Sequence, residues 1–160
     1  MATASQVRGS TTSHTITLAS LAASATAGRE GTAIDNTTDL AIDAELFGKI
    51  TTGTTPTPGG SIEVWVYGSG DGSNYGGGAS GTNAALTPTA SSLLSLALII
   101  PVTATSNVTH TFYAGSVAAL FGGVLPAKWG VFVRNNTGVA LNATAGNHAI
   151  QHRTIKYASA

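Results

Sequence analysis

The sequence has no cysteine and little charge. Without cysteine the chain forms no disulfides, has no thiolate metal ligands and offers no thiol nucleophile. Asp, Glu, Lys and Arg make up only 9% of the chain, against roughly 25% in an average soluble domain. Because a weakly charged surface is poorly protected from self-association, we expect much of this surface to be covered by other protein.

An excess of one charge sign and a long hydrophobic run are lacking too. The seven acidic and seven basic residues cancel, and the pI is about 6.9, so no net charge attracts nucleic acid or an anionic membrane. The longest apolar run, Leu93–Val102, is interrupted by Ser95 and Pro101. It is far shorter than the roughly 20 residues of a membrane-spanning helix. We therefore expect no nucleic-acid partner and no membrane partner.

Apolar and polar residues alternate with a period of two over several segments, a pattern typical of strands in antiparallel sheets. The clearest segment is Ser61–Tyr75. Its Ile and Val residues face one side, Glu63, Trp65 and Tyr67 face the other, and a glycine-rich turn follows. Trp129–Arg134 has the same alternation. We expect these two segments to pair at the centre of the fold.

The remaining alternating segments, together with these two, predict about eight strands and no helix. They are His14–Leu21, Ala22–Arg29, Leu40–Thr52 with a bulge at Gly48, Leu93–Val102, Val108–Val117, Val139–Ala143 and His148–Tyr157. This pattern predicts an all-β fold, an antiparallel β-sandwich in which the jelly roll is the favoured topology. An immunoglobulin-like sandwich or a barrel is the alternative.

The chain divides into an arm and one domain. Met1–Ser13 is rich in Ser and Thr and is expected to be a flexible N-terminal arm, which leaves residues 14–160 as a single β-sandwich domain.

One third of the chain carries no charge. From Gly72 to Ala127 there is no Asp, Glu, Lys or Arg. Burying unpaired charge between subunits is costly, so such a segment is expected at an interface. An ordinary surface rich in Ser, Thr and Asn is the alternative. The glycine-rich loop at the start of this segment, Gly68–Asn83, is therefore expected to be a contact surface.

No group of residues indicates catalysis, a cofactor or a metal site. His148 and His152 have a spacing that binds zinc on a helix, but on a strand it separates them by about 13 Å. The acidic residues from Asp35 to Glu45 are spaced too loosely for a calcium loop, and Asp71 lacks a second acid beside it. Nucleophile-elbow, P-loop and dinucleotide motifs are absent. We predict a protein that is not an enzyme.

Two stretches resemble a group of small virion proteins of tailed bacteriophages. They are LFGKITTGTTPTPGGSIEVWVY at Leu46–Tyr67 and LFGGVLPAKWGVFVRNNTGVALNATAGNHAI at Leu120–Ile150. The resemblance implies a structural virion component, a capsid decoration (cement) protein of β-sandwich type. A place in the tail or at the neck is the alternative.

The resemblance also implies partners and a location. The partners are the major capsid protein or other virion proteins, the chain forms a homo-oligomer with a trimer favoured, and the protein resides in the virion after assembly in the host cytoplasm. The candidate protein-contact residues are Arg8, Trp65, Tyr67, Asp71, Tyr75, Phe121, Leu125 and Trp129. A different function remains open: a carbohydrate-binding module on a phage fibre, with Trp65, Tyr67 and the Ser69–Tyr75 loop as its site.

Overall fold

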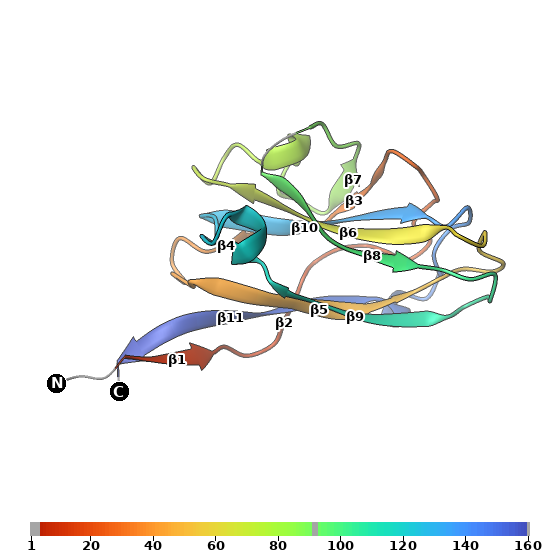
Figure 1. The fold of residues 1–160 in the computed structure, drawn as a ribbon. Helices are drawn as coiled ribbons and strands as arrows, with labels where there is room; N and C mark the ends of the chain where they lie inside the picture. Colours follow the sequence, from red (N-terminus) through yellow and green to blue (C-terminus); the bar gives the residue numbers. More distant parts are fainter. Residues whose placement is uncertain (1–3, 91–92, 160) are drawn as a thin grey trace.

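Two antiparallel β-sheets lie face to face in the computed structural model, which describes residues 4–90 and 93–159 (Figure 1). Within these ranges the helical elements are three short 3-10 turns, η1 (Gly76–Gly78), η2 (Ala118–Phe121) and η3 (Ala145–Asn147). No helix in the same ranges is long and apolar enough to cross a membrane.

Each sheet draws its strands from the whole length of the chain. The first sheet consists of β1 (Ala4–Arg8), β2 (Thr12–Ser13), β5 (Asp43–Thr51), β9 (Thr109–Ser116) and β11 (Ala149–Ser159). Its order is β1-β11-β5-β9, and β2 also pairs with β11. The second sheet consists of β3 (Gly28–Glu30), β4 (Ile34–Asp35), β6 (Ser61–Ser69), β7 (Ala84–Leu86), β8 (Leu94–Pro101) and β10 (Lys128–Asn136). Its order is β7-β3-β10-β6-β8, and β4 also pairs with β10.

This strand order is that of a jelly roll. β1 with β2 and β3 with β4 can each be counted as one interrupted strand, which leaves eight main strands without β7. The first of these strands then pairs with the last, the second with the seventh, the third with the sixth and the fourth with the fifth: β1–β11, β3–β10, β5–β9 and β6–β8. Such nested pairing is a long hairpin folded across two sheets, the topology of an eight-stranded jelly roll. The predicted all-β sandwich is therefore confirmed, and β7 is an additional strand at one edge.

The predicted pairing at the centre is confirmed as well. β6 and β10 pair without interruption from Ser61 opposite Asn136 to Ser69 opposite Lys128. The inward side chains of both strands are fully buried against the first sheet, where each large apolar group contributes about 1.5–3 kcal/mol. These residues are Ile62, Val64, Val66, Trp129, Val131 and Val133, packed with Leu46, Ile50 and Ile150.

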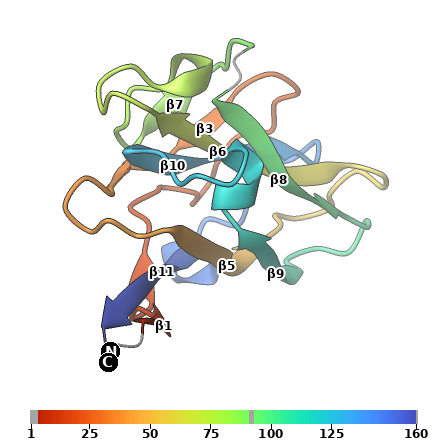
Figure 2. The same ribbon diagram turned by 60° about the vertical axis from the view of Figure 1, so that its left-hand side comes forward.

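The outer face of the second sheet is covered by a third layer. Tyr67 and Phe132 point outward yet are fully buried, because Ala79 and Leu86 pack on them. The covering segment, residues 70–90, lies above the second sheet in Figures 1 and 2. The Glu30 carboxylate holds it in place by accepting hydrogen bonds from the backbone and hydroxyl of Ser80 and from the backbone of Gly81. Part of the expected contact loop Gly68–Asn83, including Gly76, Gly77 and Ala79, is therefore packed on its own sheet.

Three expected strands differ from the structure. Only Thr12 and Ser13 pair with β11, and residues 14–21 then cross from the first sheet to the second, with Leu18 buried in the core. Ala22–Arg29 contributes only Gly28 and Arg29 to a strand. Residues 139–143 form no strand. Their turn is held by the Asn135 side chain, which donates to the carbonyls of Val139 and Leu21.

The expected N-terminal arm is in part a strand. Ala4–Arg8 pairs with the end of β11, and every residue of this strand is exposed. The last residues of β11 extend beyond the end of β5, so the two strands project from the sandwich as a ribbon with Ala4 and Ser159 paired at its tip (Figures 1 and 2). Met1–Thr3 lie outside the described residues.

The bulge predicted at Gly48 lies on a neighbouring strand instead. The pairing of β5 with β9 shifts between Leu46 and Phe47, where Ala114 has no opposite residue. The next residue, Gly115, has a φ of +68°, a conformation that favours glycine. Gly48 instead allows β5 to lie close to β11, because a Cβ at this position would lie 2.1 Å from the carbonyl oxygen of Ala149.

The central strand pair provides a stability test. A Cβ on Gly130 would lie 2.3 Å from the ring of Tyr67, and this ring is fully buried. We expect Gly130→Ala to lower the free energy of unfolding in urea by about 1–3 kcal/mol, the usual cost of overpacking. Gly146→Ala is the control, because nothing lies within 4 Å of a Cβ at that position. Equal losses in the two variants would contradict the packing described for Tyr67.

Candidate interaction surface

The outer face of the first sheet is the candidate interaction surface, because no described segment covers it as residues 70–90 cover the second sheet. Register fixes which side chains share it: Phe47 lies opposite Tyr113, Glu45 opposite Arg153, and Gln6 opposite Tyr157. Leu46, between Glu45 and Phe47, points into the core. We call this surface the open face and define it by Arg8, Glu45, Phe47, Tyr113, Arg153 and Tyr157.

An ion cluster joins all four main strands at the centre of the open face. The Glu45 carboxylate on β5 accepts a hydrogen bond from Arg8 Nε on β1 at 3.0 Å and one from the Tyr113 hydroxyl on β9 at 3.2 Å. Its other oxygen lies 2.9 Å from the Arg153 guanidinium on β11. The same guanidinium lies over the Phe47 ring, 5.4 Å from its centroid. Strands far apart in the sequence are thus tied together by one carboxylate.

The cluster determines the electrostatics of the face. Burial acts to raise the pKa of the Glu45 carboxyl, but the hydrogen bond and charge of Arg8, with Tyr113 and Arg153, outweigh it and lower that pKa below its ordinary value. Two guanidinium groups share one carboxylate, so the cluster carries one net positive charge. Tyr113 and Tyr157 flank it with 62% and 66% of their surfaces exposed. Exposed tyrosines beside arginine are typical of protein–protein contacts.

Most other charged side chains have partners within the chain. Ion pairs join Arg134 to Glu63, Lys156 to Asp39 and Lys128 to Asp35. Asp43 accepts hydrogen bonds from the backbone of Ala44 and Ala118, and Arg29 donates to Asn83. The four acids from Asp35 to Glu45 therefore serve separate structural contacts. Among the described residues no group of three or more His, Asp or Glu side chains is placed to hold a metal ion.

The candidate contact residues from the sequence fall in different places. Arg8 lies on the open face, with 60% of its side chain exposed. Trp65 is half-buried on the opposite side of the molecule, where its Nε1 donates to Glu63 at 3.0 Å and the Arg134 guanidinium lies 5.6 Å from its ring. Tyr75 is half-buried in the covering layer beside that sheet. The structure does not bring these residues together into one site.

Three of those residues belong to the interior, which corrects the expectation for them. Leu125 and Trp129 are buried in the main core. Tyr67 is fully buried, its hydroxyl donates to the Gly31 carbonyl, and burial raises its pKa. Their aromatic and apolar character reflects packing between layers rather than contact with a partner. Phe121 is half-buried and also packs against the core.

The loop acid Asp71 closes its own turn. Its carboxylate accepts hydrogen bonds from the Ser69 hydroxyl, the backbone of Ser73 and the backbone and side chain of Asn74. The hydrogen bonds of Asn74, followed by those of Ser73 and Ser69, lower the pKa of Asp71. Its role is that of an Asx-type turn residue.

Apart from Arg8, the sequence does not identify the exposed residues of the open face. Tyr113 and Tyr157 lie in segments that the alternation correctly predicts as strands. Alternation separates two faces but does not say which layer covers each. Strand register supplied the missing information, because it places Tyr113 beside Phe47 and on the same face as Glu45.

No protein-family model, curated protein or solved structure matches this chain. The virion-protein resemblance of Leu46–Tyr67 and Leu120–Ile150 therefore stays a prediction. A function can be inferred from the open face and from the way the chain uses its charges.

The ion cluster gives a second test. Glu45→Gln leaves two guanidiniums without a carboxylate, so we expect it to lower the free energy of unfolding by about 1–2 kcal/mol at neutral pH. Because the pKa of Glu45 is lowered on folding, this difference is complete above the ordinary value of about 4.5. It disappears as the pH falls below that value and through the lowered pKa.

The control for Glu45→Gln is Asp35→Asn. Asp35 is also paired with a cation, but it is exposed and its oxygen is 3.9 Å from Lys128 Nζ. We expect little change in urea-unfolding midpoint, because exposed pairs contribute little. A loss in Asp35→Asn as large as that in Glu45→Gln would contradict the special role of the cluster.

Proposed function

We propose that this protein is a structural component of a tailed-phage virion that binds the assembled capsid and stabilises it, as a decoration or cement protein without catalysis. The observation that carries this proposal is the open face: a sheet face left uncovered, with two exposed tyrosines around an arginine-rich cluster. The virion-protein resemblance of Leu46–Tyr67 and Leu120–Ile150 supports it independently.

The surface chemistry suits a protein partner. Contact surfaces between proteins are enriched in Tyr and Arg and depleted in Lys, Glu and Asp. On the open face, Glu45 is buried beneath its partners, while Arg8, Tyr113 and Tyr157 reach the solvent. The partner that we propose is the major capsid protein or another protein of the virion shell.

A repeating shell also suits a homo-oligomer. We propose a trimer around a symmetry axis of the capsid, which presents three open faces at a fixed spacing. When several weak contacts form within one complex, the overall affinity exceeds that of each contact by orders of magnitude. A single open face of modest size is then sufficient for stable binding.

A place in the tail, neck or fibre would use the same surface, and copy number separates these locations. Hundreds of copies per virion indicate the capsid, a ring-sized number indicates the neck or tail, and a few copies indicate a fibre. The carbohydrate-binding alternative is not favoured, because Tyr67 is fully buried and Trp65 is half-buried. These two side chains do not form an exposed stacking platform.

The binding test uses empty heads of the phage that encodes the chain, prepared without this protein. We expect the purified protein to bind them stoichiometrically and to raise the temperature and the chaotrope concentration at which the heads disrupt. Co-sedimentation and head-disruption curves measure both effects. Absence of binding to heads, or labelling of virions confined to tails, contradicts the capsid assignment.

The contact surface is tested by the double variant Tyr113→Ala/Tyr157→Ala. We expect its affinity for heads to fall at least about tenfold, because exposed tyrosines at interfaces commonly contribute more than 1 kcal/mol each. Leu40→Ala is the matched control, because Leu40 is 74% exposed but lies in the loop before β5 rather than on the open face. An equal loss in the control, with both variants folded by circular dichroism, contradicts the role of the open face.

A further inference from the structure

Three aromatic rings meet in the interior, and the proposed function does not use them. His14, His152 and Trp129 are buried between the two sheets. The ring centroids are 4.8 Å apart for the two histidines, 5.1 Å for His14 and Trp129, and 5.2 Å for His152 and Trp129. The cluster therefore joins the first sheet, through β11, to the second sheet, through β10.

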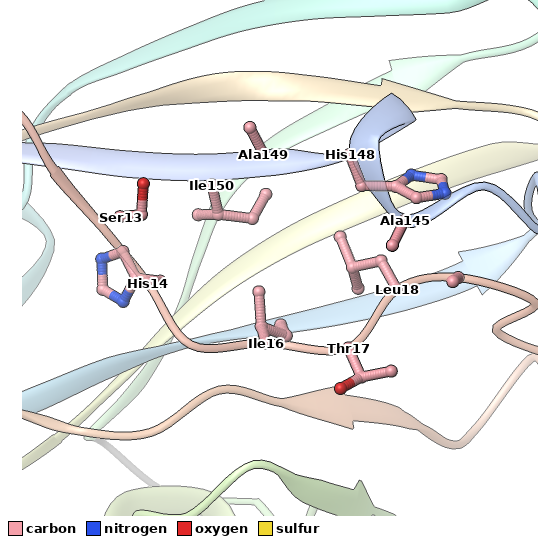
Figure 3. Close-up of a pocket in the computed structure, with 10 residues that line it drawn as sticks. Ser13, His14, Ile16, Thr17, Leu18, Ala145, His148, Ala149 and Ile150 are labelled. Atoms are coloured by element: carbon pink, nitrogen blue, oxygen red, sulfur yellow. The ribbon is translucent and has the colours of Figure 1, made fainter.

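His14 begins the segment that crosses between the sheets, which we call the side strap and define as residues 14–21. Its backbone N–H donates to the Ile150 carbonyl on β11, and the next residue, Thr15, accepts from Thr32 beside the second sheet. Figure 3 shows the strap running from His14 past Ile16 to Leu18, alongside Ile150 and the start of β11. His14 is thus the point at which the strap leaves the first sheet.

The nitrogens of this cluster are largely unpaired. Both ring nitrogens of His14, Nδ1 of His152 and Nε1 of Trp129 are buried without a hydrogen-bond partner among residues 4–90 and 93–159. A buried imidazolium would add another N–H with nothing to accept it, and it would lie close to a second imidazole. Both effects disfavour the charged form.

Few nearby charges favour the protonated form of His14 or His152. The 36–42 loop brings Asp39 near His152, where its carboxylate favours the protonated ring, but Asp39 is already paired with Lys156 of β11. The residues opposite His152 are uncharged, Leu46 on β5 and Thr12 on β2.

The other titratable groups nearby lie outside the cluster. His148 lines the same pocket as His14, and its Nε2 contacts the Asn142 carbonyl at 2.9 Å. Arg153 and Glu45 occupy the opposite, outer face of the first sheet. Burial, followed by the proximity of His152, lowers the pKa of His14 to about 3, and burial also lowers the pKa of His152.

We propose that His14 and His152 form a pH-sensitive latch, which holds the side strap closed while both rings are neutral and releases it when they are protonated. In the released state the strap leaves the side of the sandwich and Trp129 becomes accessible to water. Protonation in this state gives each imidazolium the solvation that it lacks in the closed state. No external ligand is required.

The sign of the effect follows from linkage. The closed state has lowered histidine pKa values, whereas a released histidine titrates near 6.5. Below that pH the released state binds more protons, so its population rises by up to about tenfold per pH unit for each histidine. Between pH 7.5 and 5.5 we expect opening to increase about 10-fold to 100-fold, with the lower value reflecting the opposing charge of Asp39.

Segment-resolved hydrogen exchange on the full chain tests the latch. After correction for intrinsic rates, peptides from residues 14–21 are expected to exchange about 10-fold to 100-fold faster at pH 5.5 than at pH 7.5. Peptides from β6 serve as the internal reference for global unfolding. A strap whose corrected exchange is independent of pH, or changes in step with β6, overturns the proposal.

The matched variants are His14→Phe/His152→Phe, which keeps two rings but removes both titrations, and His110→Gln on the edge strand β9. The first is expected to abolish the pH dependence of strap exchange, and the second to retain it. A pH dependence that persists in the double variant overturns the latch.

If the double variant does not fold, NMR titration of the histidine ring protons in the unmodified protein decides. The latch requires two rings that stay neutral well below pH 6.5 for as long as the strap is protected. Two rings that titrate near 6.5 while the strap remains protected overturn it.

Discussion

The pairing of β6 with β10 is the interaction on which the rest of the structure depends, because this pair is buried on both faces. Its inner side chains pack against the first sheet, and its outer residues Tyr67 and Phe132 require a second cover. A strand pair buried twice needs three layers, and the chain supplies the third from residues 70–90. The first sheet lies at the end of this stack and keeps one face exposed. The open face is therefore a consequence of how the central pair is buried.

The low charge of the chain follows partly from the same arrangement. Glu30, Glu45 and Glu63 are all buried, and each is held by hydrogen bonds or cations that offset the cost of removing it from water. The uncharged segment from Gly72 to Ala127 lies partly over Tyr67 and Phe132. Internal covering is a sufficient reason for the lack of charge in that part. Tyr113 of the same segment does reach the open face, so an interface remains proposed for the edge strand rather than for the loop.

The sequence is sufficient to predict most of the long strands, the inner faces of β6 and β10 and the jelly-roll class, because alternation and turn residues are local signals. Alternation is ambiguous where a strand and an irregular crossing segment have the same pattern. His14–Leu21 alternates like a strand, yet it crosses between the sheets as the side strap. The sequence is also insufficient where burial depends on distant layers. The sequence suggests Trp129 as a contact residue, whereas in the structure His14 of the strap and His152 of β11 cover it. The contact of His14 with His152 depends on a register that no short pattern encodes.

The latch and the open face are joined by a short stretch of chain. Arg8 contributes to the ion cluster, and His14 contributes to the buried rings. Within this stretch the backbone N–H of Gly9 donates to the Thr154 carbonyl, and the backbone N–H of His14 donates to the Ile150 carbonyl, both on β11. Release of His14 would leave β2 paired with β11, and Arg8 would still be held by the pairing of β1 with β11 and by Glu45. The released histidines titrate near 6.5, whereas Glu45 protonates only below its ordinary value of about 4.5. On acidification the strap is therefore expected to open more often while Glu45 is still charged, so the latch and the ion cluster respond to pH over separate ranges.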